Sequence, residues 1–258
     1  MTEFPDRATL DAARLTVALF RPDDDRLADG VELVESLGAT PVPDPMLAVD
    51  PTGETPRPAD FVVFTSKTGV ELAARAAWTP DDTVVCAIGS RTADALRAAG
   101  YPVDLVPEEF SSAGLVAALE GEVDGATVEV ARSDHGSPLL LSGLREAGAE
   151  VHETVLYRLV RPEGSGRSAE LAAAGDVDVA LFTSSLTVEH FLAAAAERGV
   201  REEAVADLNE AVVAAIGDPT RETAEAEGLA VDVVPGTASF EALATEAVEF
   251  AAPSHAGE

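Results

Sequence analysis

The sequence is poor in cysteine, histidine and long apolar runs, and each shortage excludes a class of protein. Cys86 is the only cysteine, so a disulfide within the chain is impossible, and its apolar surroundings predict a buried thiol. No apolar run approaches the roughly 18 residues needed to span a bilayer, and the first residues lack the pattern of a signal peptide. The four histidines do not have the spacing of a metal site. We therefore expect a cytoplasmic protein without a membrane segment or a metal.

Basic residues are also scarce. The chain has 17 basic against 47 acidic residues, a net charge of −30, and Lys67 is its only lysine. Such a balance argues against a nucleic-acid partner. Because the acidic residues are spread along the chain, we expect a surface adapted to concentrated salt and a halophilic archaeal source. The alternative is an acidic surface that binds a partner.

Two parts of the chain repeat each other. Phe64-Thr65-Ser66 recurs as Phe182-Thr183-Ser184. Ala87-Ile88-Gly89 recurs as Ala215-Ile216-Gly217, and this longer match continues without a gap to Leu115 and Leu243, with 12 of 29 positions identical. A third, weaker match sets Arg21 against Arg132. The pattern indicates two copies of one unit.

Each copy alternates short apolar runs with helical patterns. The predicted strands are 61–65, 84–88, 103–106, 179–183, 211–216 and 231–234, and the helices that follow them are 68–77, 91–99, 111–119, 187–198, 219–227 and 239–250. Two more strand-helix units cover 15–38 and 126–148. This alternation predicts an α/β fold with doubly wound parallel sheets. Its expected division is a discontinuous domain of 1–40 plus 166–258, a domain of 58–151, and linkers 41–57 and 152–165.

Polar residues gather where predicted strands end and helices begin. Backbone N–H groups and hydroxyls at such ends bind anions. The expected substrate-binding residues are Thr65, Ser66, Lys67, Gly89, Ser90, Thr92, Arg132, Thr183, Ser184, Ser185, Gly217 and Thr220. The alternative is that the serines and threonines only cap helices and the glycines only permit tight turns.

An ordered series of motifs resembles the uroporphyrinogen-III synthase family. It comprises Phe64 to Val70, Ala87-Ile88-Gly89 with Thr92-Ala93, Pro107 with Phe110 to Leu115, Leu144 to Ala149 leading to Val155-Leu156-Tyr157, and Phe182 to Ser185. The resemblance implies two flavodoxin-like domains joined by a two-stranded linker. It also implies cyclisation of hydroxymethylbilane, a linear tetrapyrrole, to uroporphyrinogen III with loss of water and no cofactor. We expect a monomer.

Tyr157 is the expected catalytic residue of that reaction. Departure of hydroxide needs a proton, and a phenol is protonated at neutral pH and can supply it. The alternative is that Tyr157 only packs its ring in the linker strand. A second hypothesis for the whole chain is a binding protein or sensor for an anionic metabolite, which would share the fold and catalyse nothing.

Overall fold

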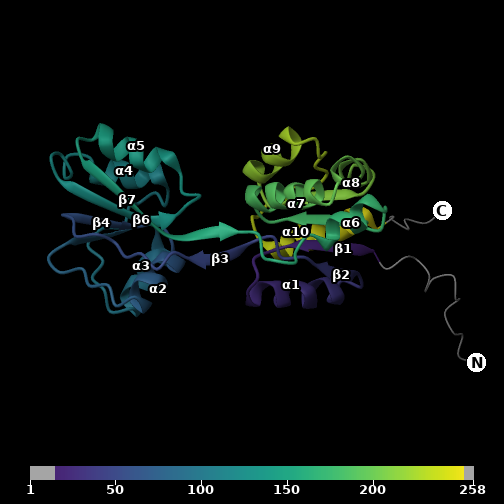
Figure 1. The fold of residues 1–258 in the computed structure, drawn as a ribbon, viewed down its shortest axis with the longest axis horizontal. Helices are drawn as coiled ribbons and strands as arrows, with labels where there is room; N and C mark the ends of the chain where they lie inside the picture. The colour runs from purple at the N-terminus through teal and green to yellow at the C-terminus, as the bar shows by residue number, and fades with distance from the viewer. Residues whose placement is uncertain (1–14, 253–258) are drawn as a thin grey trace, which may run out of the picture. The chain divides into compact units, whose positions relative to one another are not determined.

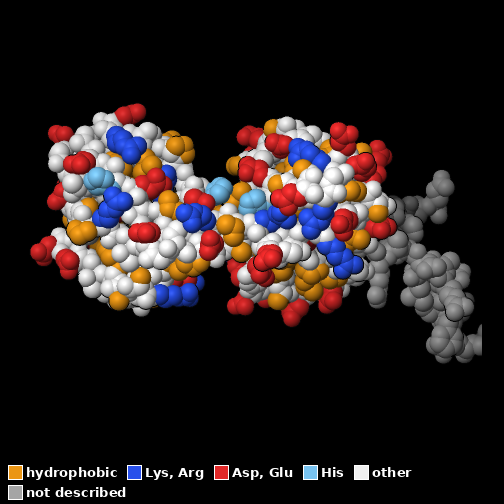
Figure 2. Space-filling view, viewed as in Figure 1, with side chains coloured by type: hydrophobic (Ala, Val, Ile, Leu, Met, Phe, Trp, Pro, Cys, Tyr) orange, Lys and Arg blue, Asp and Glu red, His pale blue; other side chains and the backbone are white. Residues whose placement is uncertain are grey.

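The computed structural model describes residues 15–252 and divides into two units. Unit 1 holds residues 15–48 and 160–252 and unit 2 holds residues 49–159 (Figure 1). The ends of the expected discontinuous domain, 1–14 and 253–258, lie outside the described residues. Asp and Glu side chains are scattered over the visible face of each unit (Figure 2). No helix within 15–252 has the length and apolarity to cross a membrane.

Unit 1 is a four-stranded parallel sheet in the order β2-β1-β8-β9. Its strands are β1 (Thr16–Phe20), β2 (Thr40–Pro43), β8 (Val179–Phe182) and β9 (Val212–Ala215). Its helices are α1 (Asp25–Ser36), α6 (Arg167–Ala173), α7 (Ser185–Glu197), α8 (Arg201–Leu208), α9 (Asp218–Ala226) and α10 (Phe240–Ala251). Phe182 and Leu192 pack in the core on one face of the sheet, and Leu19 and Leu243 pack on the other.

Unit 2 is built on a five-stranded sheet in the order β3-β7-β6-β4-β5. Its strands are β3 (Ala48–Pro51), β4 (Phe61–Phe64), β5 (Val84–Ala87), β6 (Thr127–Ser133) and β7 (Glu150–Val160). Its helices are α2 (Lys67–Arg75), α3 (Ser90–Ala98), α4 (Ser112–Leu119) and α5 (Pro138–Glu146). Helices α2 and α3 cover one face, and α4 and α5 cover the other (Figure 1). Apolar residues therefore run continuously along β4, because both of its faces are buried.

Two predicted strands are wrong. Residues 103–106 and 231–234 form only single bridges, between Cys86 and Leu105 and between Ala214 and Val233. Each segment still bonds to its neighbouring strand through the backbone, from Asp104 N–H to Val85 O and from Asp232 N–H to Val213 O, both at 2.9 Å, and an aspartate side chain adds a further bond in each unit. The Asp104 carboxylate accepts the Val85 N–H at 2.8 Å, and the Asp232 carboxylate accepts the Val213 N–H at 2.9 Å.

The segment 41–57 differs in part from the expected linker. Its first residues belong to β2, which pairs with β1 at the edge of the unit 1 sheet. Pro41 and Pro43 are tolerated there because an edge strand does not need every N–H for pairing. The next strand, β3, lies beside β7 in unit 2, where Thr52 donates from its backbone N–H to Leu156 O at 3.1 Å.

Candidate functional site

A cavity of about 210 Å³ lies at the carboxyl ends of the strands in unit 2. Parallel strands end at one edge of their sheet, so residues that follow β4 and β5 meet the last residues of β6 there, and Tyr157 joins them from within β7. Four residues predicted from the sequence line the cavity: Thr65, Ser66, Arg132 and Tyr157. The other wall residues are Ile88, Ser112, Ser133, Gly136, Ser137 and Leu140.

Tyr157 and Ser66 form a hydrogen-bonded pair in the cavity wall. The Tyr157 hydroxyl donates to Ser66 Oγ at 3.0 Å, and the same oxygen accepts the Gly69 N–H at 3.0 Å as the N-cap of α2. A β-bulge sets the direction of the Tyr157 side chain, because the register between β6 and β7 shifts so that Ser133 pairs with Tyr157. Tyr157 is 6% exposed, so its hydroxyl is held at the cavity with little freedom.

Arg132 brings a buried cation to the cavity. The residue is 6% exposed, its Nε donates to the Glu153 carboxylate at 2.6 Å, and its Nη1 donates to Ser137 O at 2.6 Å. The chain turns closely around it at Gly136, where an added Cβ would lie 2.5 Å from Arg132 Cδ. The guanidinium is therefore fixed by an anion on one side and by a carbonyl on the other.

Glu153 and the turn at 136–137 were not predicted as functional. Glu153 lies on β7, and only the pairing of β7 with β6 brings it to Arg132. The turn could have been found from the pair Ser137-Pro138, because serine is favoured as an N-cap and proline as the first residue of a helix, the positions that they take in α5. No pattern in the sequence identifies Glu153.

Four other predicted residues of unit 2 lie outside the lining of this cavity. Lys67 is exposed and pairs with Glu71 at 3.3 Å. Gly89 is the N-cap of α3, where an added Cβ would lie 3.2 Å from Phe110 Cβ, and Ser90 beside it is exposed. Thr92 is buried in the first turn of α3.

The predicted residues of unit 1 lie at the corresponding strand ends, with their hydroxyls bonded locally. Thr183 Oγ1 donates to Phe20 O at 2.6 Å, Ser184 forms a capping box with Thr187, and Ser185 Oγ donates to Pro219 O at 3.0 Å. Gly217 is the N-cap of α9, and Thr220 is buried in its first turn. Of these residues, Ser184 caps a helix with its side chain, Thr183 bonds to the carbonyl of the last residue of β1, and Ser185 bonds to the first turn of α9.

Arg21 directly follows β1, and Arg132 is the last residue but one of β6. Its guanidinium carbon lies 3.9 Å from the centre of the Phe240 ring, and its Nε is buried without a hydrogen-bond partner among the described residues. Burial lowers the pKa of this guanidinium. In the repeat match that pairs Gly89 with Gly217, Phe240 corresponds to Ser112, so in unit 1 a ring faces the arginine where unit 2 has a small residue at the cavity.

Comparisons with known proteins agree with each other. The profile of the family "Uroporphyrinogen-III synthase HemD" matches residues 29–245. A putative uroporphyrinogen-III synthase of Methanothermobacter thermautotrophicus is 35% identical over 230 residues, which cover 83% of this chain and 90% of that protein. The uroporphyrinogen-III synthase of Chlorobaculum parvum is 26% identical over 236 residues, covering 85% and 92%.

Solved structures share the fold. The chain matches a mutant uroporphyrinogen III synthase of Thermus thermophilus with a TM-score of 0.65 and 21% identity, covering 92% of this chain and 98% of that one. It matches the Helicobacter pylori uroporphyrinogen-III synthetase with a TM-score of 0.60 and 14% identity, covering 92% and 99%. Both support an α/β fold with parallel sheets.

Proposed function

The chain belongs to the uroporphyrinogen-III synthase family, and we propose that it holds its substrate at the cavity of unit 2. The protein is a cyclising lyase that converts hydroxymethylbilane to uroporphyrinogen III, with loss of water and inversion of ring D. Without the enzyme, the linear substrate closes to the type I isomer. The protein must therefore hold the substrate in the one conformation that leads to the type III isomer, and it must ease the departure of the substrate's hydroxyl group.

One observation supports this location: a buried guanidinium and a phenol line the same cavity. Hydroxymethylbilane carries carboxylates along its length and a hydroxymethyl group at one end. Arg132 is suited to a carboxylate, because its fixed fork of donors is already oriented by Glu153. Thr65 and Ser66 add hydroxyls beside it.

Tyr157 is the proposed general acid. When substrate binds, its hydroxyl exchanges the Ser66 acceptor for the leaving oxygen. The C–O bond then breaks, water leaves with the phenolic proton, and a cationic azafulvene remains. Ring D attacks through its substituted carbon to give a spiro intermediate, which fragments and recloses. The proton lost when the last pyrrole regains its aromaticity returns to the phenolate.

We also propose that the other residues predicted from the sequence bind carboxylates of the substrate. The free N–H groups at the N-termini of α3, α7 and α9 are suited to carboxylates. The residues concerned are Lys67, Gly89, Ser90, Thr92, Thr183, Ser184, Ser185, Gly217 and Thr220.

We also propose that the two units are copies of one flavodoxin-like domain, joined by the extended strands β3 and β7. The order β2-β1-β8-β9 corresponds to β7-β6-β4-β5 when the three repeated segments are aligned. Asp104 and Asp232, which the longest repeat match pairs with each other, make the same hydrogen bond to a strand N–H. The net charge of −30 supports adaptation to high salt, and we propose a cytoplasmic monomer.

The test is the product isomer. Freshly made hydroxymethylbilane in high salt, without metal or nucleotide, should give the type III isomer, separated chromatographically after oxidation to the porphyrin. Type I isomer alone, at the rate without protein, would instead favour a binding protein.

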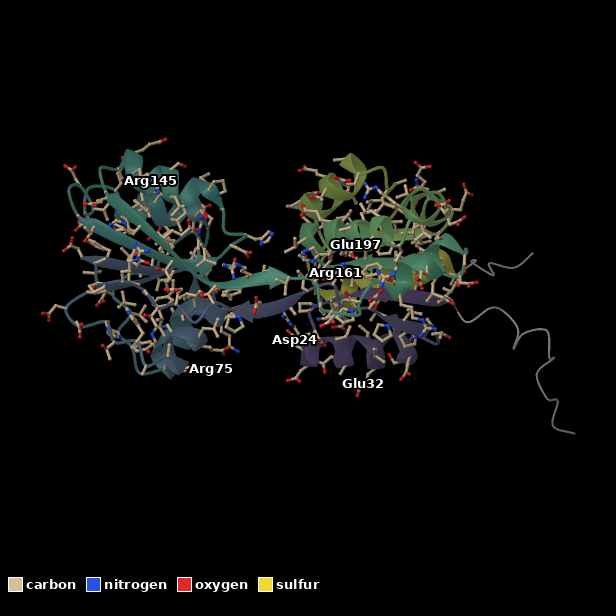
Figure 3. The ribbon with its side chains drawn as sticks, in the orientation of Figure 1. Asp24, Glu32, Arg75, Arg145, Arg161 and Glu197 are labelled. Carbon is tan, nitrogen blue, oxygen red and sulfur yellow. The ribbon has the colours of Figure 1, made fainter. Side chains whose placement is uncertain are left out.

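The location is tested by Arg132→Gln. Its KM should rise about tenfold or more, because a hydrogen bond to a charged group is lost. The matched control is Arg145→Gln, since Arg145 is exposed on α5 (Figure 3). An unchanged KM in folded Arg132→Gln would contradict a carboxylate contact at this residue.

A further inference from the structure

Phe110 is an exposed aromatic residue beside the cavity of unit 2. It is 61% exposed, in the turn that precedes α4. Two residues later, Ser112 lines the cavity, and the glycine that Phe110 contacts, Gly89, directly follows the lining residue Ile88. Phe110 therefore stands at the rim between two wall segments.

The backbone at Gly89 makes room for this side chain. A Cβ at Gly89 would lie 3.2 Å from both Cβ and Cγ of Phe110. Gly89 has a φ of −172°, an extended conformation that any residue adopts, so its small size and not its flexibility matters here. The base of the Phe110 side chain rests on this glycine while most of the residue remains exposed.

Unit 1 has no aromatic residue at the corresponding position. In the match that pairs Gly89 with Gly217, Phe110 corresponds to Ala238, and a Cβ at Gly217 would meet only Pro219 Cδ, at 4.0 Å. A single exposed phenylalanine needs no explanation by itself. This one is distinguished by its place at the rim, in the unit that has the cavity.

We propose that Phe110 binds substrate by stacking its ring on a pyrrole ring of hydroxymethylbilane. The inference rests on the proposed location of the substrate in unit 2. The edges of a pyrrole ring carry the carboxylates, which Arg132 and the hydroxyls contact, and its flat face is apolar. Aromatic rings prefer to cover such a face. Loss of hydroxide leaves positive charge on the azafulvene, which an aromatic face attracts, so stacking at the reacting end would also favour the chemical step.

The test separates stacking from simple apolar contact. Phe110→Leu keeps an apolar side chain and removes the aromatic face, whereas Phe110→Tyr keeps the face. Phe250→Leu is the matched control, because Phe250 is also 61% exposed and lies in the last turn of α10. For each variant we would measure kcat/KM for the type III isomer, the affinity for uroporphyrinogen III by anaerobic calorimetry, and Tm.

We expect Phe110→Leu to lose about threefold to tenfold in kcat/KM and in affinity, with an unchanged Tm. Phe110→Tyr and Phe250→Leu should resemble the wild type. The proposal is overturned if Phe110→Leu keeps wild-type values, or if Phe110→Tyr is impaired as strongly. Wild-type KM in Arg132→Gln beside an impaired Phe110→Leu would refute the carboxylate contact at Arg132 and still support stacking.

Gly89→Ala gives a second test. Its Cβ should displace the Phe110 ring and reduce kcat/KM in the wild-type background, with little further effect in Phe110→Ala. Equal losses in both backgrounds would mean that Gly89 acts independently of Phe110, and this would count against the rim as described.

Discussion

Replacing Tyr157 by phenylalanine should separate the chemical role of this residue from its structural role. The substitution removes one oxygen and leaves the ring, which packs in the core with Leu156 and Phe64. The lost hydrogen bond is the one from the hydroxyl to Ser66 Oγ at 3.0 Å. Ser66 Oγ keeps the N–H of Gly69, so no buried acceptor is left without a partner.

The two roles predict effects of very different size. Loss of the hydrogen bond costs about 1 kcal/mol, which lowers Tm by roughly 2–4 °C in a protein of this size. Loss of general-acid help should lower kcat by about 10² to 10⁴. KM should change less, because the contacts to the substrate carboxylates remain.

Ser66→Ala is the matched control. It removes the other partner of the same hydrogen bond and the N-cap of α2, so it should cost about 0.5–2 kcal/mol of stability. It keeps the phenol, and kcat should fall far less than in Tyr157→Phe.

The assay is isomer composition at saturating substrate. Uncatalysed closure gives the type I isomer, so a slower enzyme is seen as a rise in type I at the expense of type III. A folded Tyr157→Phe with a kcat close to that of the wild type would refute the proposed acid. Tyr157 would then be structural, and the proton would come from water or from the substrate.

Four further outcomes are expected. Glu129 is fully buried and neither carboxylate oxygen has a hydrogen-bond partner among residues 15–252, so Glu129→Met should raise the urea midpoint; a lower midpoint would show that this carboxylate is satisfied. Gly136→Ala should raise KM by displacing Arg132, whereas Gly236→Ala, which meets nothing within 4 Å, should not; equal KM values would contradict the close turn. Burial raises the pKa of Cys86 from 9.0 to about 12, so the thiol of the folded protein should resist alkylation at pH 8 and react after unfolding. The free energy of unfolding should be unaffected by this group below pH 9 and should fall as the pH rises from 9 toward 12, because the unfolded chain then loses the thiol proton first. Tm should rise with KCl, because salt screens the net charge of −30; greatest stability in dilute buffer would refute salt adaptation.

The sequence predicts the helices and strands whose limits depend on local residues. Ser66 and Ser184 are N-caps close to where their patterns place the helix starts, and the strand before each is a short apolar run. The sequence pattern does not predict helix α6, whose N-terminus is stabilised by a residue far along the chain. The Asp44 carboxylate accepts the N–H groups of Gly166 and Ser168, at 2.7 and 2.8 Å.

The residues of the site also fall into those that the sequence predicts and those that it does not. Thr65, Ser66 and Arg132 could be predicted because each follows a strand or lies near its end, and parallel strands end at one edge. Tyr157 lies within β7, and the resemblance of the motif series to the family indicated it instead. The partners of these residues could not be predicted. Glu153 meets Arg132 through the pairing of β7 with β6, and the bulge opposite Ser133 sets the direction of Tyr157. Both depend on strand register, which tertiary packing decides.

The proposed repeat also explains why only one copy of a feature need be functional. Arg21 and Arg132 correspond in the weakest of the three repeat matches, and both arginines lie at the end of a central strand. Phe240 and Ser112 correspond in the longest one. The ring of Phe240 lies 3.9 Å from the Arg21 guanidinium, whereas Ser112 leaves space in the cavity that Arg132 lines. An arginine at the end of a central strand can therefore pack against a ring in one unit and line a cavity in the other, and we propose that the size of the corresponding residue, Phe240 or Ser112, contributes to this difference.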